Sequence, residues 1–431
     1  MFVRALEAEQ EIHISNQPAE DAVATVHVSG RLNKKTGTYR PLVDASGMKF
    51  ASIISIDDKV EITVFREGNR SNIVVRPLRF DIHAATTVST QKDQRLSLLS
   101  LAAGGGLGTA SFLDTEHFVS VQEIEFEDDS AEVLKHNYPN SYLFVGDLRD
   151  VQNVVKSDVS LVTLPCNDFS KIGDGGEGVF NNLVIGAARI LRAADSRVCF
   201  FENVPGYYKS AAYKKLQIAL RDVYPYWMNP IEIDSFDWGS IAHRPRAYSL
   251  AFKTEEDMFA FQVPKKPRFL RKKLREVLDH AASKDFEWKP VARWMESFRS
   301  KAEKGNSWAD RSISKTFVTK DATELQTIPK RYRSQSCSNS YVLSDDGESF
   351  RFLTISELRK IFSVPEWFSF PDFTPLLRQY EMLGQAVDGR IFKVFANAIA
   401  ELLLMRPRSA AAKPEVPLSL QEDGQLSLLI G

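Results

Sequence analysis

Short apolar runs alternate with amphipathic stretches over residues 95–252. Each run has the length and the β-branched or aromatic content of a buried strand. The strands are predicted at residues 96–101, 118–123, 142–147, 161–164, 198–203, 231–234 and 247–252. The amphipathic stretches at residues 128–137 and 179–191 have helical spacing and lie between strands. Strands that alternate with helices are typical of an α/β protein with a doubly wound sheet.

The chain outside this region has different patterns. Residues 1–92 contain apolar or alternating runs at 24–28, 50–56, 60–65 and 72–75, which predict a small β-rich domain of no readable function. We expect four further segments: a catalytic domain at 93–253, an insertion at 254–350, a return to the catalytic domain at 351–405 and a flexible tail at 406–431.

Composition limits the classes of function. The 431 residues carry a formal net charge of -1, so any affinity for nucleic acid must come from local basic clusters. Two such clusters, at 265–275 and 329–334, lie in the insertion. For the first, a solvated helix face is an alternative; in the second, interleaved aromatic and hydroxyl residues favour contacts with phosphates and base edges.

Cysteine content and hydropathy exclude other classes. Three cysteines without metal-ligand spacing argue against a disulfide framework or a zinc site and fit a reducing cytosol. We expect no secretory leader, because residues 1–9 lack a basic region followed by an apolar core, and no apolar run is long enough for a bilayer.

Candidate chemistry lies where predicted strands end. Cys166 follows Pro165 at the end of the strand at 161–164, and Glu202 and Asn203 end the strand at 198–203. The carboxyl ends of strands in such a sheet face the ligand crevice. A lone cysteine there can equally be a small buried thiol. Upstream, the glycine-rich turn at 103–108 joins a strand to a helix, an arrangement that lets the backbone approach a nucleotide.

Taken in order, these motifs resemble those of the DNA cytosine-5 methyltransferase family. Its glycine-rich loop, Pro-Cys pair, Glu-Asn-Val strand end and Arg-x-Arg strand correspond to residues 102–108, Pro165-Cys166, residues 202–204 and residues 244–246. Two later motifs, at 351–357 and 383–387, extend the resemblance, which covers residues 95–252 and 350–405.

The resemblance implies a Rossmann-like methyltransferase sheet with a target-recognition insertion. It also implies that the protein transfers a methyl group from S-adenosylmethionine to carbon 5 of cytosine in double-stranded DNA. Cys166 would attack carbon 6 of the flipped-out base, Glu202 would bind the base near N3, and Arg244 and Arg246 would orient the carboxylate and stabilise charge.

The resemblance also assigns residues to the cofactor. Glu123 and Asp147, at predicted strand ends, would contact ribose and adenine, although either acid alone could be a helix N-cap. The full predicted cofactor set is Ala102, Gly104, Gly106, Glu123, Ile124, Asp147, Leu148, Pro165, Gln385 and Val387.

The sequence departs from the family pattern at several positions. Asn167 and Asp168 follow the cysteine where a Gln is usual, Ala102 replaces an aromatic residue, Ala242 stands where a Gln precedes the arginines, and Gln385 replaces an Asn. The thiol, the carboxylate and both arginines are retained, so we expect activity.

Two other functions fit the same residues: a DNA-binding relative that no longer catalyses, and a methyltransferase acting on RNA. Retention of Cys166 and Glu202 argues against the first, and the basic insertion favours DNA over RNA. Residues 425–429, Gln-Leu-Ser-Leu-Leu, resemble the peptide that binds the bacterial sliding clamp; an incidental apolar end, or one docked on the protein's own surface, is the alternative. We also expect a monomer in the bacterial cytoplasm, associated with the nucleoid.

Overall fold

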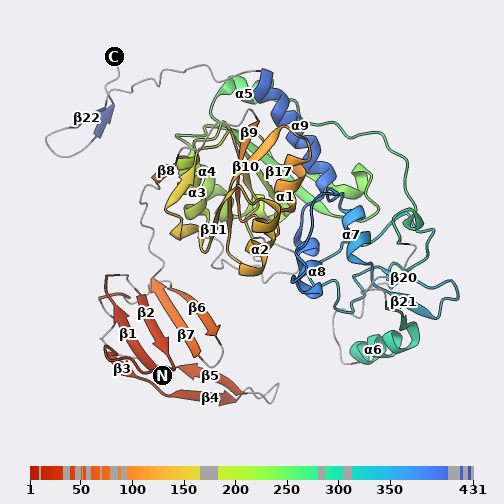
Figure 1. The fold of residues 1–431 in the computed structure, drawn as a ribbon, viewed down its shortest axis with the longest axis horizontal. Coiled ribbons are helices and arrows are strands. Elements are labelled where there is room, and N and C mark those ends of the chain that lie inside the picture. The colour runs from red at the N-terminus through yellow and green to blue at the C-terminus, as the bar shows by residue number, and fades with distance from the viewer. Residues whose placement is uncertain are drawn as a thin grey trace. The chain divides into compact units, whose positions relative to one another are not determined.

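The computed structural model divides into two compact units, Met1–Ala84 with Gly176–Ile185 and Ala85–Gly175 with Gly186–Gly431 (Figure 1). The structure describes residues 1–8, 11–32, 39–43, 50, 52–54, 60–67, 70–77, 86–88, 95–165, 183–279, 287–303, 313–405, 418–420 and 426–428. Within them, no helix has both the length and the apolar content needed to span a bilayer.

The smaller unit is built on an antiparallel five-stranded sheet of order β3-β1-β2-β7-β6. Its core contains Val3, Ile12 and Ile14 from the first two strands. A separate hairpin pairs β4 (Val28–Leu32) with β5 (Tyr39–Val43). The sheet strands are β1 (Phe2–Leu6), β2 (Glu11–Ser15), β3 (Ala24–Thr25), β6 (Val60–Glu67) and β7 (Arg70–Pro77).

One predicted strand of this unit is wrong. The apolar run at 50–56 forms a turn in its described part, where the amides of Ile53 and Ile54 donate to the carbonyl of Phe50. Ile53 is fully buried in the core of the unit. The run is therefore apolar because the turn inserts a side chain into the core.

The larger unit contains an eight-stranded sheet of order β11-β10-β9-β13-β14-β17-β15, with β16 also paired to β17. The first five strands are parallel and β17 is antiparallel to β14, so the predicted doubly wound α/β fold is confirmed. The strands are β9 (Leu96–Leu101), β10 (Phe118–Glu125), β11 (Tyr142–Val145), β13 (Val159–Val162), β14 (Val198–Asn203), β15 (Tyr226–Trp227), β16 (Ile231–Asp234) and β17 (Pro245–Phe252). A short strand, β8 (Thr86–Val88), pairs with β12 (Asn153–Val155) in this unit.

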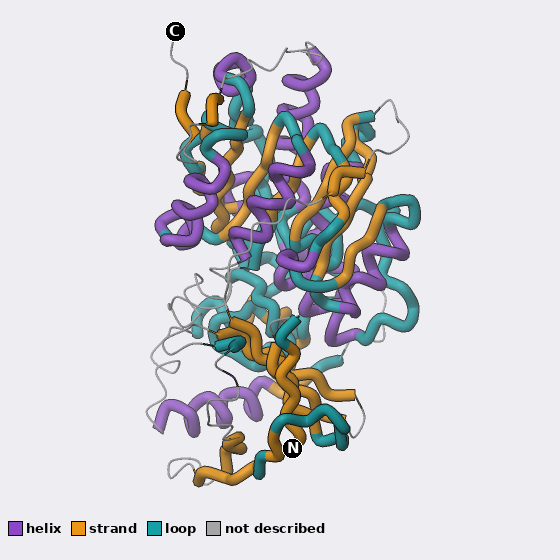
Figure 2. The backbone as a smooth tube through the Cα atoms, turned by 90° about the vertical axis from the view of Figure 1, so that its left-hand side faces the viewer, coloured by secondary structure: helices purple, strands orange, loops and turns teal. Residues whose placement is uncertain are grey.

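Helices cover both faces of the large sheet (Figure 2). On one face, α9 (Gly389–Met405) packs Phe392 and Phe395 against Phe200 of β14. The next residue, Phe201, points to the opposite face, where Trp227 stacks on it and Tyr213 of α4 (Ala211–Leu220) contacts Trp227. The strand alternation therefore gives each face its own apolar layer. The remaining helices that enclose the sheet are α1 (Leu107–Leu113), α2 (Asp128–Asn137), α3 (Leu183–Ala194) and α5 (Glu255–Ala260).

The insertion and the segment after it share one hydrophobic core with α1 and α2. A four-stranded sheet of order β18-β21-β20-β19 contributes the buried rings of Tyr341 and Phe350, which pack against each other, and Tyr341 also packs against Phe352. This core continues into α7 and α8, so the insertion is anchored to the return segment. The elements are β18 (Lys289–Pro290), α6 (Val291–Glu303), β19 (Phe317–Val318), β20 (Tyr341–Leu343), β21 (Ser349–Arg351), α7 (Ile355–Ile361) and α8 (Leu376–Gln385).

The described part of the predicted tail contains two short strands. Residues Leu418–Leu420 (β22) pair antiparallel with Leu426–Leu428 (β23). Gln425 and Leu429, which complete the clamp-like peptide, lie outside the described residues.

Candidate active site

Three adjacent parallel strands, β9, β13 and β14, bring the predicted motifs together at their carboxyl ends. The hydroxyl of Thr163 donates to the carbonyl of Ala102, 3.0 Å away. The side-chain amide of Asn203 donates to the carbonyl of Leu164 at 3.0 Å. The loop that leads through Pro165 is therefore attached both to the glycine turn and to the Glu-Asn strand end. Cys166 itself lies outside the described residues.

Glu202 is paired with Arg246 at this edge of the sheet. Arg246 Nε lies 3.0 Å from Glu202 Oε1, and the two side chains are 15% and 9% exposed. Burial raises the pKa of Glu202, while the positive charges of Arg246 and Arg244 act in the opposite direction. A buried carboxyl group with a raised pKa keeps a proton more readily at neutral pH, which suits hydrogen bonding to an accepting ring nitrogen.

Arg244 lies deeper than Arg246 and is only 1% exposed. Its guanidinium donates to the carbonyls of Ile328 and Gly384, at 3.3 and 3.2 Å, and lies over the ring of Phe362. Burial, reinforced by the charge of Arg246, lowers the pKa of Arg244 to about 9. Arg244 thus holds the insertion and α8 against the arginine strand, whereas Arg246 contacts the carboxylate.

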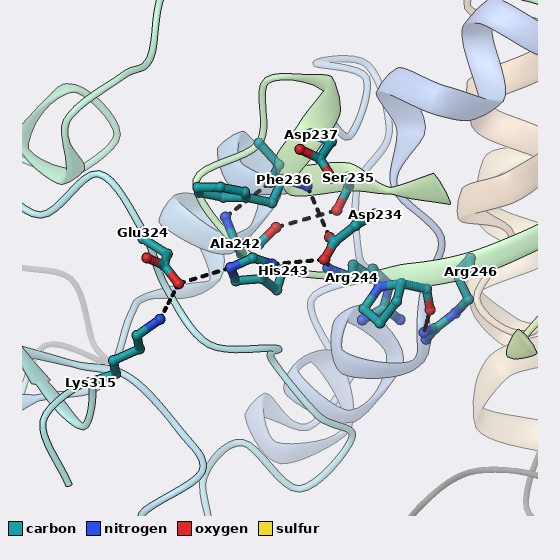
Figure 3. A network of polar contacts seen from close by, with 12 residues as sticks. Asp234, Ser235, Phe236, Asp237, Ala242, His243, Arg244, Arg246, Lys315 and Glu324 are labelled. Atoms are coloured by element: carbon teal, nitrogen blue, oxygen red, sulfur yellow. Dashed lines mark hydrogen bonds and ion pairs between the residues drawn. The ribbon is translucent and has the colours of Figure 1, made fainter. Parts of the chain in front are cut away.

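The backbone before these arginines is fixed by Asp234, the last residue of β16 (Figure 3). Asp234 Oδ1 accepts hydrogen bonds from the amides of Arg244 and Phe236, at 2.7 and 3.1 Å. Its second oxygen lies 2.7 Å from His243 Nδ1. The turn that begins β17 is therefore held by one carboxylate.

The glycine-rich turn has backbone torsions suited to a close-packed loop. Ala102, Gly104 and Gly106 all have positive φ, at 53°, 56° and 82°. A Cβ at Gly106 would lie 2.6 Å from the ring of Tyr138, whose hydroxyl donates to the Gly106 carbonyl. Position 106 therefore requires glycine both for its torsion and for space.

The carboxylate that accepts a hydrogen bond from the glycine-rich turn belongs to Glu125 and not to the predicted Glu123. The amide of Gly104 donates to Glu125 Oε2 at 2.6 Å, and the amide of Glu127 donates to Glu125 Oε1 at 2.9 Å. Glu125 is the last residue of β10, so the prediction that this strand ends at Glu123 is wrong by two residues. The following residue, Phe126, is 61% exposed.

Glu123 is buried inside the unit, at 1% exposure. The hydroxyls of Ser120 and Thr109 donate to its two oxygens, at 2.6 and 3.1 Å. Burial raises the pKa of Glu123 to about 8, although these hydrogen bonds oppose the shift. Ile124 is fully buried, and its carbonyl accepts from the amide of Ala103. Neither side chain is accessible to a nucleotide.

The other predicted cofactor residues surround the same loop. Asp147 caps the turn at Leu148–Asp150. Its Oδ1 accepts a hydrogen bond from Arg149 Nε at 2.9 Å. Leu148 and Val387 are buried and Pro165 is half-buried. Gln385 is exposed at the end of α8, the helix whose Met382 sulfur lies 3.2 Å from the position of a Cβ at Gly105.

The late motif at 351–357 has a structural role. Arg351 and Glu357 form a buried bidentate pair, with Nη1–Oε2 and Nη2–Oε1 distances of 2.8 and 2.7 Å. Glu357 also accepts from the amide of Thr354, whose hydroxyl accepts from the amide of Glu357 in return. This capping box starts α7 and connects the insertion to the return segment.

Several residues of the two basic clusters make contacts within the protein, where the sequence predicts contacts with phosphates and base edges. Tyr332 is fully buried, and its hydroxyl donates to the carbonyl of Ser340, so the prediction that it contacts bases is wrong. Arg333 stacks over the rings of Phe352 and Tyr380. In the first cluster, Arg271 donates to two backbone carbonyls, of Phe236 and Ser240. Aromatic residues in a basic run thus mark a core as readily as a nucleic-acid surface.

A doubly wound sheet with a glycine turn after one strand and an acid at the end of the next defines an α/β protein with a site for a nucleotide-type cofactor, and the buried Glu202–Arg246 pair lies at the same edge of the sheet. Residues 96–401 match the C-5 cytosine-specific DNA methylase family, and the chain belongs to that family. The predicted relationship to the DNA cytosine-5 methyltransferases is thereby confirmed.

Two curated relatives are type II methyltransferases. M.Bsp6I of Bacillus sp. (strain RFL6) is 28% identical over 183 residues, and the match covers 39% of this chain and 56% of that relative. M.NgoMIV of Neisseria gonorrhoeae is 28% identical over 204 residues, with 46% and 64% covered. The chain thus spans less than two thirds of the length of either relative.

Two solved structures share the fold. The Entamoeba histolytica methyltransferase EhMeth aligns with a TM-score of 0.58 and 15% identity, covering 72% of this chain and 99% of its own. The S. pombe Dnmt2 methyltransferase aligns with a TM-score of 0.54 and 16% identity, covering 72% and 99%. At these identities the likeness establishes the fold alone.

Proposed function

We propose that this protein methylates carbon 5 of cytosine in double-stranded DNA through a covalent bond between Cys166 and carbon 6 of a flipped-out base. The observation that carries the proposal is the Glu202–Arg246 pair, which lies on the strand beside the loop leading to Cys166. Family membership gives the reaction class, and the pair provides the group that the base requires.

Carbon 5 of cytosine is a weak nucleophile, so the ring must first become electron-rich. The Cys166 thiolate forms a bond to carbon 6 while the Glu202 carboxyl group hydrogen-bonds or protonates N3, which receives the displaced electron pair. S-adenosylmethionine would supply the methyl group to carbon 5 and leave as S-adenosylhomocysteine. Loss of the carbon 5 proton to a base then restores the double bond and expels the Cys166 thiolate, and any proton given to N3 returns to Glu202. Arg246 keeps Glu202 oriented during both steps.

The residues around the glycine turn fit this cofactor. The turn presents backbone at Ala102, Gly104 and Gly106, and Glu125 lies at the end of the next strand, where acids accept hydrogen bonds from ribose hydroxyls. We therefore assign ribose binding to Glu125 in place of Glu123, and contact with the adenine ring to Phe126 in place of Ile124. The assignments retained from the sequence are Ala102, Gly104, Gly106, Asp147, Leu148, Pro165, Gln385 and Val387.

A single trapping experiment distinguishes the proposed activity from the two rival functions, a catalytically silent DNA-binding relative and an RNA methyltransferase. DNA carrying 5-fluorocytosine is incubated with the protein and S-adenosylmethionine, and a covalent adduct is sought by denaturing electrophoresis and mass spectrometry. Fluorine cannot leave as a cation, so the adduct persists. We expect trapping by the wild type and none by Cys166→Ser. A silent relative gives no adduct in any cytosine context although it binds DNA, and an RNA enzyme is trapped only by the matching RNA.

We assign the protein to the bacterial cytoplasm as a nucleoid-associated monomer, and residues 425–429 to a sliding-clamp contact. Extended peptides with leucines at alternating or adjacent positions can fill an apolar groove. Titrating a fluorescent peptide of residues 419–431 with purified clamp tests this contact. We expect saturable binding that Leu428→Ala with Leu429→Ala removes; equal binding by both peptides, or none at high micromolar concentration, would reject it.

A further inference from the structure

His243 lies between two carboxylates that come from different parts of the larger unit (Figure 3). Its Nδ1 is 2.7 Å from Asp234 Oδ2, at the end of β16, and its Nε2 is 3.0 Å from Glu324 Oε1, in the insertion. It is the residue immediately before Arg244. Neither the family resemblance nor the proposed function assigns this side chain a role.

Both contacts are hydrogen bonds only if the imidazole is protonated. Carboxylate oxygens accept and do not donate, so each ring nitrogen must carry a hydrogen. Partial burial alone opposes this charge, but the hydrogen bonds to Asp234 and Glu324 outweigh it and raise the pKa of His243. The geometry is therefore that of an imidazolium ion held by two anions.

The other groups that face this cluster keep it ordered. The ring of Phe236 stacks on His243, with centroids 4.3 Å apart, and Arg271 lies over the ring of Phe236 at 3.8 Å. Lys315 pairs with the same Glu324 oxygen that contacts the imidazole. The charged groups around His243 are thus Asp234, Glu324, Lys315 and Arg271, together with Arg244 beside it in sequence.

The insertion follows the arginine strand along this contact. The amide of Leu325 donates to the carbonyl of Ile241 at 2.6 Å, and the amide of His243 donates to the carbonyl of Leu325 at 3.1 Å. Arg244 then bonds the carbonyl of Ile328. Residues 324–328 therefore lie beside residues 241–244. Arg246, the partner of Glu202, follows two residues after Arg244. Residues 324–328 lead directly into the second basic cluster at 329–334.

We propose that His243 is a positioning residue that couples the insertion to catalysis. By bridging Asp234 and Glu324, it fixes residues 324–328 against the arginine strand, so that DNA bound by the insertion holds Arg246 and Glu202 in their working positions. This inference rests on the proposed function, because it concerns the same cytosine site.

Three variants test the bridge. His243→Gln removes the charge, Glu324→Gln removes one anion, and His243→Arg keeps a permanent cation with several donors. We expect the first two to lower kcat roughly tenfold with the KM for S-adenosylmethionine unchanged, and their combination to cost no more than either alone. His243→Arg should restore most of the activity. His117→Gln, at an exposed position, is the control.

The pH profile separates positioning from a purely structural role. The wild-type bridge is complete below the pKa of His243 and is lost as the pH rises through it, so kcat should fall on the alkaline side. His243→Arg stays charged and should lack that fall. Equal profiles for wild type and His243→Arg, or a His243→Gln protein with normal kcat and only a lower Tm, would overturn the proposal.

Hydrogen exchange provides a readout that does not depend on activity. His243→Gln should speed exchange of the Leu325 amide, which donates to Ile241, while leaving the amides of β9 unchanged. Unaltered exchange at Leu325 would reject the bridge. Absence of 5-fluorocytosine trapping by the wild type would instead reject the proposed function, with the exchange result still deciding whether the bridge exists.

Discussion

Asn203 holds the loop that leads to Cys166 by donating its side-chain amide to the carbonyl of Leu164, 3.0 Å away. Its own side-chain oxygen accepts from the amide of Val204 at 2.9 Å, and the residue is 4% exposed. One amide therefore connects the end of β14, which carries Glu202, to the segment after β13 that leads toward Cys166. This gives the Asn of the Glu-Asn-Val motif a physical role.

We expect Asn203→Ala to lower kcat by roughly 10-fold to 100-fold, because a small displacement of a reacting group is costly. The unpaired buried carbonyl should also lower the free energy of unfolding by about 1–3 kcal/mol. Asn137→Ala is the matched control, since Asn137 on α2 bonds the carbonyls of Val133 and Ser369. It should lower stability but leave kcat nearly unchanged; an equal loss of kcat in both variants would contradict the role of Asn203.

A second prediction concerns Glu123 and the pH dependence of stability. Burial raises the pKa of its carboxyl from 4.5 to about 8. Between these values the folded protein binds a proton that the unfolded chain has released, so stability falls as the pH rises through this window. The slope approaches about 1.4 kcal/mol per pH unit in the middle of the window.

Glu123→Gln removes this titration and keeps the size of the side chain. We expect the variant to lose less stability than the wild type between pH 5 and pH 8, measured by denaturant unfolding at several pH values. Glu132→Gln, at an exposed position on α2, is the control and should follow the wild-type curve. Parallel curves for wild type and Glu123→Gln would show that Glu123 is already ionised at pH 5.

The sequence predicts the order of the site motifs and the strands that carry them, because each motif sits at the end of an apolar run. It fails for β10, which contains two buried acids, Glu123 and Glu125, on either side of Ile124. The strand has a register irregularity between Ser120 and Gln122, and Glu123 is buried because Ser120 and Thr109 donate to it. A polar residue in the sequence normally indicates the end of a buried run, so the sequence predicts that the strand ends two residues too early.

Tertiary partners also account for the other misplaced residues. Tyr332 lies in a basic run, yet its ring packs among Tyr341, Phe352 and Tyr380. His243 shows no local signal, because its partner Glu324 is distant in sequence. Glu125 and Phe126 have one usable signal, which is that they stand just before Glu127, the N-cap of α2. Side chains whose partners are long-range cannot be assigned from a local pattern.

The basic run at 265–275 contains cations that pair with a carboxylate and cations that do not, and we expect their substitution to affect DNA binding differently. Lys273 and Arg275 both pair with Asp321. Lys265, Arg268 and Lys272 are exposed and make no ion pair within the described part of the chain. Replacing these three by Ala should weaken DNA binding equally for all sequences and reduce the salt slope by about 2–3.

Lys273→Ala with Arg275→Ala is the comparison for that experiment. This pair should have a smaller effect on the salt slope, because both cations already neutralise Asp321 in the protein. Fluorescence anisotropy at several salt concentrations measures the slopes for target and non-target duplexes. A changed methylation motif in either variant would mean that the run reads bases and does not act through phosphates.

The last prediction decides between the two acids proposed for ribose binding. Glu125 receives the Gly104 amide at the end of β10 and Phe126 beside it is exposed, whereas Glu123 is enclosed. We expect Phe126→Ala to raise the Kd for S-adenosylmethionine by about threefold to tenfold, the value of one aromatic stacking contact. Glu125→Gln should raise it by a similar or larger factor, because a charged hydrogen-bond acceptor is lost. Glu123→Gln should bind like the wild type at pH 7, since its side chain faces Ser120 and Thr109. Calorimetric titration measures all three without requiring turnover, and weaker binding by Glu123→Gln than by Glu125→Gln would return the ribose contact to Glu123.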